Sequence, residues 1–175
     1  MRTSIALIGF MGTGKTAVGQ RLAEKLGKEF IELDALIEKK AGKPIPEIFR
    51  KEGEIRFREL EIEATLETAA KKNAVIACGG GIVLNKINID RLMKQCVIVC
   101  LEASPAVILK RTSGDTDGRP LLAVTDREQQ IKELQKQRKP YYERAAEITV
   151  NTSRISINAA TDKIIEILGN YENNN

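Results

Sequence analysis

A glycine-rich stretch, GFMGTGKT at residues 9–16, follows the apolar run Ser4–Ile8 and precedes a segment of helical periodicity, Lys15–Leu26. It matches the pattern G-x-x-x-x-G-K-[ST], in which glycines let successive backbone N–H groups approach phosphate oxygens without a Cβ in the way. The N-terminus of the following helix adds its dipole and unpaired N–H groups. Lys15 is placed to reach the β- and γ-phosphates, and the Thr16 hydroxyl to bind Mg²⁺. The pattern predicts a loop that holds a nucleoside triphosphate.

Short apolar runs alternate with segments of helical periodicity along the chain. The runs are Ser4–Ile8, Glu29–Leu33, Ala74–Cys78, Cys96–Leu101 and Glu147–Val150. The helical segments are Lys15–Leu26, Ile55–Ala70, Asn88–Lys94, Pro105–Lys110, Arg127–Arg144 and Ile157–Leu168. Short continuous strands separated by helices are typical of a parallel sheet covered on both faces. We therefore expect an α/β fold in three layers, α/β/α, with a five-stranded parallel sheet.

The helix boundaries carry their own signals. Thr125-x-x-Glu128 predicts a capping box before the Arg127 helix, and Ser104 followed by Pro105 predicts another helix start. Gly169 predicts the end of the last helix, with residues 170–175 as a flexible tail. Since no linker divides the chain, we expect residues 1–175 to form a single domain.

Two stretches interrupt the alternation. Asp34–Gly53 contains short helical pieces where one crossover helix would suffice, and Thr112–Asp126 is a long loop with two glycines. A loop of that length inside a compact domain is usually a functional lid or disordered. Both stretches are expected to border a cleft at the carboxyl edge of the sheet, where ligands of open α/β folds bind.

The composition excludes several classes of protein. Apolar residues make up 42% and charged residues 30% of the 175 residues, which is ordinary for a globular protein. No apolar run approaches the roughly 20 residues of a membrane helix, and the N-terminus lacks the layout of a signal peptide. The three cysteines form no C-x-x-C pair, so buried core thiols are expected rather than a disulfide or zinc framework. We therefore predict a cytoplasmic protein without a membrane partner.

The charge and the lack of histidine restrict the chemistry. With no histidine in the chain, carboxylates, lysine or the substrate itself must move protons. The net charge of +4 suits a small anionic ligand at least as well as a nucleic acid, and no basic stripe interleaved with aromatic residues is present. A nucleic-acid partner is therefore not expected.

The class of nucleotide-binding protein is narrowed by further motifs. A GTPase should carry N-K-x-D, whereas residues 85–88 read NKIN. Large ATPases usually show an apolar strand that ends in Asp or Asp-Glu, and the runs ending at Glu102 and Asp34 match this imperfectly. The run Ala74–Cys78 instead leads into Gly79–Gly81, which leaves bare backbone where a ligand can approach. A tight turn is the alternative, although it needs one or two glycines more often than three.

Two arginines lie on apolar helical stripes. Arg58 falls between Ile55 and Ile62 on a stripe that continues to Leu66 and Ala69. Arg138 falls on a second stripe, which consists of Ile131, Leu134, Tyr141 and Ala145. A guanidinium on a core-facing stripe must be paired or must face a cleft. The alternatives are a surface pair of Arg58 with Glu61 and a snorkelling Arg138 side chain at Pro140. Together, the two arginines favour recognition of a carboxylate or phosphate.

The sequence resembles the shikimate kinases over nearly its whole length. The resemblance rests on GFMGTGKTAVGQRLA, LDALIE, IPEIFRKEGEIRFRELE, GGG, GRPLL and QRKPYYERAA, and the set GE-x-x-FR-x-x-E, Gly79–Gly81 and RPLL at 119–122 is highly specific. It implies a P-loop NTPase of the nucleoside-monophosphate-kinase type, with a substrate-binding insertion at 34–61 and a lid at 112–126. It also implies phosphorylation of the shikimate 3-hydroxyl by ATP with Mg²⁺, giving 3-phosphoshikimate and ADP.

The resemblance further implies the roles of individual residues. Lys15, Asp34 and Arg119 would be catalytic, and Thr16 would hold Mg²⁺. ATP would contact Gly12, Thr13, Gly14, Lys15, Thr16, Ala17, Arg111, Arg119 and Arg154, with Arg111 and Arg154 at the adenine. Shikimate would contact Asp34, Arg58, Gly79, Gly80, Gly81 and Arg138. The family usually has D-x-D where this chain has Glu32-Leu33-Asp34, so the part that Glu32 plays at the metal is left open.

Three alternative functions remain to be weighed. A gluconate kinase of the same fold should lack the set Arg58, Gly79–Gly81 and Arg138. A regulatory nucleotide switch without catalysis is disfavoured by the intact Lys15 and Asp34. A nucleic-acid-binding ATPase fits the short chain and mild charge poorly. The expected partners are therefore ATP and shikimate, bound by a monomer.

Overall fold

The computed structural model of the chain describes residues 2–113 and 126–173, without the side chains of residues 171–173. Five strands form one sheet: β1 (Ser4–Gly9), β2 (Glu29–Glu32), β3 (Ala74–Ala77), β4 (Cys96–Glu102) and β5 (Ile148–Asn151). The strands pair in parallel throughout, in the order β2-β3-β1-β4-β5. The predicted five-stranded parallel sheet is therefore confirmed, with strand ends within one residue of the apolar runs.

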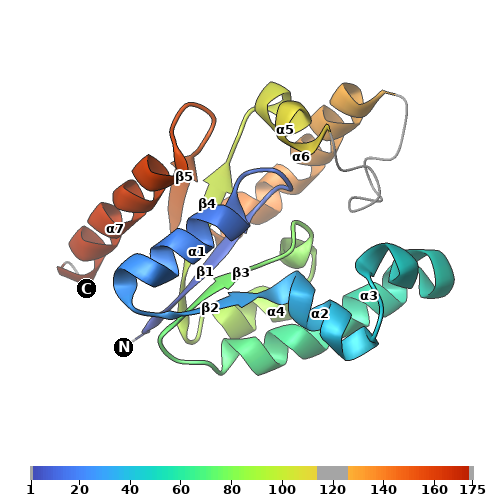
Figure 1. The fold of residues 1–175 in the computed structure, drawn as a ribbon, viewed down its shortest axis with the longest axis horizontal. Helices are drawn as coiled ribbons and strands as arrows, with labels where there is room; N and C mark the ends of the chain where they lie inside the picture. Colours follow the sequence, from blue (N-terminus) through green and yellow to red (C-terminus); the bar gives the residue numbers. More distant parts are fainter. Residues whose placement is uncertain (1, 114–125, 174–175) are drawn as a thin grey trace.

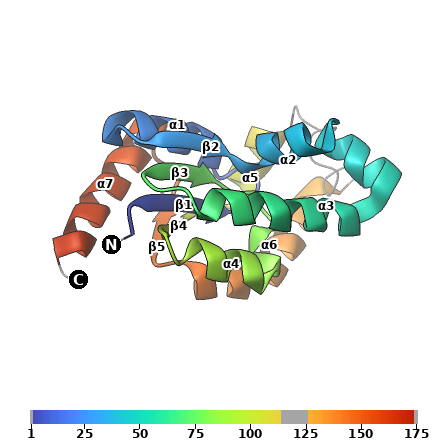
Figure 2. The same ribbon diagram turned by 90° about the horizontal axis from the view of Figure 1, so that it is seen from below.

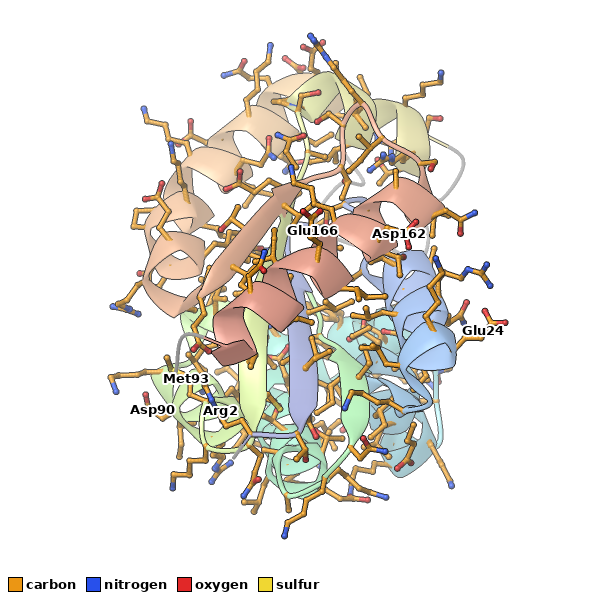
Figure 3. The ribbon with its side chains drawn as sticks, turned by 90° about the vertical axis from the view of Figure 1, so that its left-hand side faces the viewer. Arg2, Glu24, Asp90, Met93, Asp162 and Glu166 are labelled. Atoms are coloured by element: carbon orange, nitrogen blue, oxygen red, sulfur yellow. The ribbon has the colours of Figure 1, made fainter. Side chains whose placement is uncertain are left out.

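Helices cover both faces of the sheet. They are α1 (Lys15–Leu26), α2 (Leu33–Ala41), α3 (Ile45–Ala69), α4 (Lys86–Leu92), α5 (Pro105–Thr112), α6 (Arg127–Ala145) and α7 (Ile157–Asn173), with a 3₁₀ turn η1 (Ile82–Leu84). Figure 2 shows α1 above the strands and α4 below them, with α3 running across the view at the height of the middle strands. In Figure 3, α7 crosses in front of the sheet, and Asp162 lies on the side of α7 nearer α1. The Asp162 carboxylate pairs there with Lys25 of α1.

The central strand β1 separates two hydrophobic cores. Ile5 and Leu7 pack with residues of α1 and α7, whereas Ala6 and Ile8 pack with residues of α3, α4 and α6. Successive side chains of a strand point to opposite faces, so a central strand with two covered faces is apolar at every position. All six residues of β1 are buried. Burial on both faces explains why the run Ser4–Ile8 is continuous and not alternating.

The carboxyl edge of the sheet carries an extra layer of helix. Gly53 has φ 82° and ψ 173°, which breaks α3 into a first limb, residues 45–52, and a second limb, residues 54–69. Figure 1 shows α2 and the first limb of α3 projecting beyond the strands. These elements fill the stretch that interrupted the alternation in the sequence. Of the predicted lid, only residues 112, 113 and 126 are described.

One predicted helix boundary is wrong. The last helix runs through Gly169 to Asn173, so residues 170–173 of the expected tail continue the helix. Gly169 has nothing within 4 Å of an added Cβ. An exposed glycine in a regular helix lowers the stability of the helix but does not by itself end it. The capping box predicted at Thr125 involves a residue outside the described part of the chain, and α6 is capped by Asp126, whose side chain accepts a hydrogen bond from the Gln129 N–H. The predicted cap at Ser104 is confirmed.

The three cysteines are buried and free, as the sequence predicts. Burial raises the pKa of the Cys96 and Cys100 thiols to about 12 and that of Cys78 well above its usual value. Within the described residues, no helix combines the length and apolarity needed to span a membrane.

Candidate active site

The glycine-rich loop joins β1 to α1 in a conformation that side chains would obstruct. Gly9, Gly12 and Gly14 have φ values of 142°, 76° and 98°, in the range that favours glycine. A Cβ on Gly9 would lie 2.2 Å from the Leu101 carbonyl oxygen of the neighbouring strand. Thr13 is fully buried, and its hydroxyl donates to the Phe10 carbonyl at 2.8 Å. The Thr13 side chain therefore braces the loop rather than lining its open side.

Lys15 lies at the start of α1 and reaches back over the loop. Its Nζ donates to the carbonyl oxygens of Gly9 at 2.8 Å and Phe10 at 2.9 Å. Desolvation lowers the pKa of Lys15, and the negative charge of Asp34 opposes that shift. An ammonium group has three N–H donors, so one remains for a further acceptor such as a phosphate oxygen.

Thr16, at the start of α1, contacts Glu32, at the end of β2. The Thr16 hydroxyl donates to the Glu32 Oε2 atom at 2.7 Å. Burial raises the pKa of Glu32, while the hydrogen bond from Thr16 opposes the rise. The glutamate that replaces the family's usual aspartate thus still reaches the threonine expected at a metal.

Asp34 follows β2 and presents an oxygen without a partner. Among the described residues, its buried Oδ1 atom has no hydrogen-bond partner. The same atom lies 3.0 Å from the position of a Cβ added to Gly79, so the bare glycine backbone forms the facing wall. Burial raises the pKa of Asp34, and the charges of Lys15 and Arg58 oppose the rise. A buried polar atom of this kind points to a ligand.

Arg58 and Glu61 form an ion pair on the second limb of α3. Arg58 Nη1 lies 3.0 Å from Glu61 Oε1, and the Glu61 side chain is only 1% exposed. Arg58 also pairs with the exposed Glu54. Burial raises the pKa of Glu61, and the Arg58 guanidinium opposes the rise. The surface pair considered as an alternative therefore exists, but it lies inside the cleft.

Arg138 is a buried guanidinium on α6. It is 5% exposed and lies over the Phe10 ring, 5.8 Å from the centroid. A Cβ on Gly80 would come within 3.6 Å of its Nη1 atom. One turn later on α6, the Tyr142 hydroxyl donates to the Gly80 carbonyl. The cleft therefore gathers groups from the ends of three neighbouring strands and two helices.

Arg111 joins the loop to the end of β5. Its guanidinium donates to the Gly12 carbonyl at 3.1 Å and to the Thr152 carbonyl at 2.8 Å. The Thr152 hydroxyl in turn donates to the Thr13 carbonyl at 2.7 Å. Arg154 follows two residues later and is exposed. Arg111 thus lies at the proposed nucleotide side, with Arg154 on the loop beside it.

These groups line one cavity of about 430 Å³. Its wall contains Gly12, Gly14, Lys15, Thr16, Ala17, Asp34, Arg58, Gly79, Gly80, Gly81, Arg111 and Arg138 among the residues predicted from the sequence. Thr13 and Arg154 do not line it, and Arg119 lies outside the described residues. The cavity also includes Glu61 and an apolar wall of Ile45, Phe49 and Phe57, which the sequence analysis missed. The motif GE-x-x-FR-x-x-E contains both Phe57 and Glu61, so it held the missing signal.

Comparison of the whole chain with known proteins identifies its family. The family model of shikimate kinase matches residues 11–169. The chain belongs to the shikimate kinase family. Shikimate kinases of Caldanaerobacter subterraneus subsp. tengcongensis and Thermodesulfovibrio yellowstonii are each 48% identical to it, over 93% of this chain and 94% and 93% of theirs.

A solved structure agrees with the family. The shikimate kinase from Acinetobacter baumannii in complex with shikimate superposes with a TM-score of 0.92 at 40% identity, covering 97% of this chain and 95% of that one. The predicted fold class and family are confirmed.

Proposed function

We propose that the chain transfers the γ-phosphoryl group of ATP to the 3-hydroxyl of shikimate, giving 3-phosphoshikimate and ADP. The reaction belongs to the biosynthesis of chorismate and the aromatic amino acids. The observation that carries the proposal is the unpartnered Asp34 Oδ1, which lies in a cavity that also holds two arginines and the phosphate-binding loop. A hydroxyl group is the kind of donor that this oxygen lacks.

The acceptor is held by the half of the cavity away from the loop. Arg58 and Arg138 bind the shikimate carboxylate, because guanidinium groups pair with carboxylates in a bidentate manner. Within the described residues, the N–H groups of Gly79, Gly80 and Gly81 donate no hydrogen bond, so they are free for the ligand. Asp34 accepts from the reacting hydroxyl and orients its oxygen toward the phosphate. Burial raises the pKa of this carboxyl, which makes it a better proton acceptor than an exposed aspartate.

The nucleotide is held by the loop. Backbone N–H groups of residues 12–17 bind the phosphates, and Lys15 donates its remaining N–H to them. Phosphoryl transfer requires alignment and charge neutralisation more than covalent help. Arg111 and Arg154 border the adenine. Arg119 of the lid reaches the phosphates when the lid closes and excludes water.

The residues around Thr16 fit Mg²⁺. This ion binds one or two carboxylates together with phosphate oxygens and water. Glu32 offers a carboxylate in contact with the Thr16 hydroxyl. Among the described residues, no three His, Cys, Asp or Glu side chains form a complete metal site. When bound, Mg²⁺ neutralises charge on the phosphates. Glu32→Gln should raise the Mg²⁺ concentration needed for half-maximal nucleotide binding.

The alternatives are separated by one assay. ADP release is measured with shikimate, quinate and gluconate as acceptors, and with Asp34→Asn as the inactive control. We expect rapid, saturable ADP release with shikimate only. Preference for gluconate would favour the related sugar-acid kinase, and ATP binding without ADP release would favour a regulatory switch. We further propose a cytoplasmic monomer that binds no nucleic acid. Size-exclusion chromatography with light scattering tests the oligomeric state. Co-elution with a fluorescent DNA duplex in the same experiment tests nucleic-acid binding.

A further inference from the structure

Gly79, Gly80 and Gly81 form a wall of the cavity, and the Tyr142 side chain attaches this glycine wall to α6. The Tyr142 hydroxyl donates to the carbonyl oxygen of Gly80, 62 positions earlier in the chain. Tyr142 is buried, at 7% exposure, and burial raises the pKa of its phenol. The hydroxyl therefore remains a protonated donor throughout the neutral pH range.

The glycine wall needs such an attachment. Three successive residues without side chains have a large conformational freedom that folding must remove. Gly79 is fixed because its carbonyl accepts from the Ile82 N–H at 3.2 Å. For the Gly80 carbonyl, the acceptor bond from Tyr142 serves the same purpose.

Peptide geometry carries the effect into the cavity. The Gly80 carbonyl and the Gly81 N–H belong to one planar trans peptide, so they point in opposite directions. With the carbonyl drawn toward α6, the Gly81 N–H points away from α6. Gly81 lines the cavity, and a Cβ on it would lie 2.5 Å from both terminal nitrogens of Arg58. The Gly81 N–H thus lies on the side of its peptide away from Tyr142, at a residue that lines the cavity next to Arg58.

Tyr142 also adjoins the second arginine. Arg138 lies one turn earlier on α6, and its guanidinium opposes the burial-driven rise in the pKa of Tyr142. On another side, the Tyr142 ring lines a second cavity of about 310 Å³ together with Phe10 and Cys100. The ring packs in the main core on its other side, and the hydroxyl is held by two polar contacts, the bond to the Gly80 carbonyl and a hydrogen bond with the Arg138 guanidinium.

We propose that Tyr142 is a positioning residue for the acceptor: its hydroxyl fixes the Gly80–Gly81 peptide so that the Gly81 N–H donates to bound shikimate. The inference rests on the proposed function. It adds a residue that touches neither substrate and links the glycine wall to the helix that carries Arg138.

The test compares Tyr142→Phe with Tyr141→Phe. The control removes the same hydroxyl from the neighbouring residue, which is 38% exposed and whose ring lies against Arg144. Calorimetry gives the Kd for shikimate and for ADP, and steady-state kinetics give kcat and KM. Tyr142→Phe should raise the shikimate Kd and KM about 3- to 10-fold, the loss expected for one neutral hydrogen bond. The ADP Kd should stay within about twofold of the wild-type value, and Tyr141→Phe should match wild type.

Several outcomes would overturn the proposal. An unchanged shikimate Kd in folded Tyr142→Phe would mean that the hydroxyl does not position the wall. Equal weakening of shikimate and ADP would mean a general structural role. A wild-type enzyme that fails to phosphorylate shikimate would instead refute the proposed function, so the two failures are distinct.

A second measurement observes the Gly81 amide directly. The amide proton and nitrogen resonances of Gly81 are followed by NMR while shikimate is added. A shift of the Gly81 amide proton to lower field in wild type, as expected when an N–H becomes a hydrogen-bond donor, that is reduced in folded Tyr142→Phe supports the proposal. An unperturbed Gly81 amide in wild type at saturation refutes it, whether or not the variant folds.

Discussion

The substitution Gly81→Ala places one methyl group against the acceptor-binding arginine. Gly81 has φ −95° and ψ 5°, which alanine can adopt, so the backbone conformation is not the obstacle. The obstacle is space, because the added Cβ would lie 2.5 Å from both Nη1 and Nη2 of Arg58. A van der Waals contact needs roughly 3.5 Å, so the guanidinium must move by about 1 Å.

The size of the effect follows from that displacement. A misplacement of about 1 Å costs on the order of 100-fold in rate. This corresponds to about 2.7 kcal/mol of transition-state stabilisation. We therefore expect kcat/KM for shikimate to fall on the order of 100-fold, while nucleotide binding stays within about twofold. The side chain that moves has a flexible end and a second partner in Glu54, so the melting temperature should fall by less than about 4 °C.

A matched control adds the same methyl where it meets nothing. Gly169→Ala lies in α7, with no atom within 4 Å of the new Cβ. It should leave kcat/KM unchanged and stabilise the protein by up to about 1 kcal/mol. Steady-state kinetics with varied shikimate, calorimetry with ADP and thermal melting measure all three quantities. Wild-type kcat/KM in Gly81→Ala would refute the assignment of Arg58 to the acceptor.

Three further predictions concern the charged groups of the cavity. Lys15→Met should lower kcat by at least about 100-fold in a protein that still melts cooperatively, whereas near-normal kcat would contradict the phosphate role of the loop. Arg138→Ala should weaken shikimate binding by about 2 to 5 kcal/mol and ADP binding hardly at all, as measured by calorimetry; equal losses would argue for a structural role. Asp34→Asn should lose about 100-fold or more in kcat yet melt at a higher temperature than wild type near pH 8. Because burial raises the pKa of Asp34, its contribution to stability is present below the ordinary carboxyl pKa and is lost as the pH rises through the raised value. The stability gap between Asp34→Asn and wild type should therefore close toward pH 4, and a gap that widens there would contradict the raised pKa.

The fold was readable from the sequence because both faces of the sheet are buried. A strand such as β1 is buried along its whole length, so its apolar run in the sequence locates the strand and predicts its ends to within one residue. The phosphate-binding loop was equally plain, since its backbone requires glycine at Gly9 and Gly12. Arg138 was found from a stripe that was only partly right, because Ile131 and Ala145 are buried whereas Tyr141 is 38% exposed.

The stripe assigned to Arg58 was wrong although the residue belongs to the cavity. Ile55 is 80% exposed and Leu66 is 56% exposed, so that row faces away from the core. The second limb of α3 instead buries a row that includes Phe57 and Leu60. Periodicity gives the spacing of a stripe but does not say which of two apolar rows a neighbouring helix covers. In α3, packing against α2 and α4 determines which row is buried.

Glu61 shows a second limit of sequence reasoning. An Arg–Glu pair three residues apart is ordinary on an exposed helix, and nothing in the spacing distinguishes it from a pair inside a cleft. The burial of Glu61 depends on Gly79–Gly81, which come from a distant segment. A Cβ on Gly79 would lie 3.4 Å from Glu61 Oε2, and a Cβ on Gly81 would lie 2.5 Å from both terminal nitrogens of Arg58.

The inert thiols of the core make the surface of this enzyme suitable for site-specific labelling. All three cysteines are buried, and their high pKa values keep the reactive thiolate scarce at neutral pH. A maleimide dye should therefore leave the folded wild-type protein almost unlabelled. One cysteine introduced on the exposed face of α7 and one in the segment 114–125 would then carry a donor and an acceptor fluorophore without removal of any native residue. Energy transfer between them would test the proposed lid role of this segment, as each substrate is added.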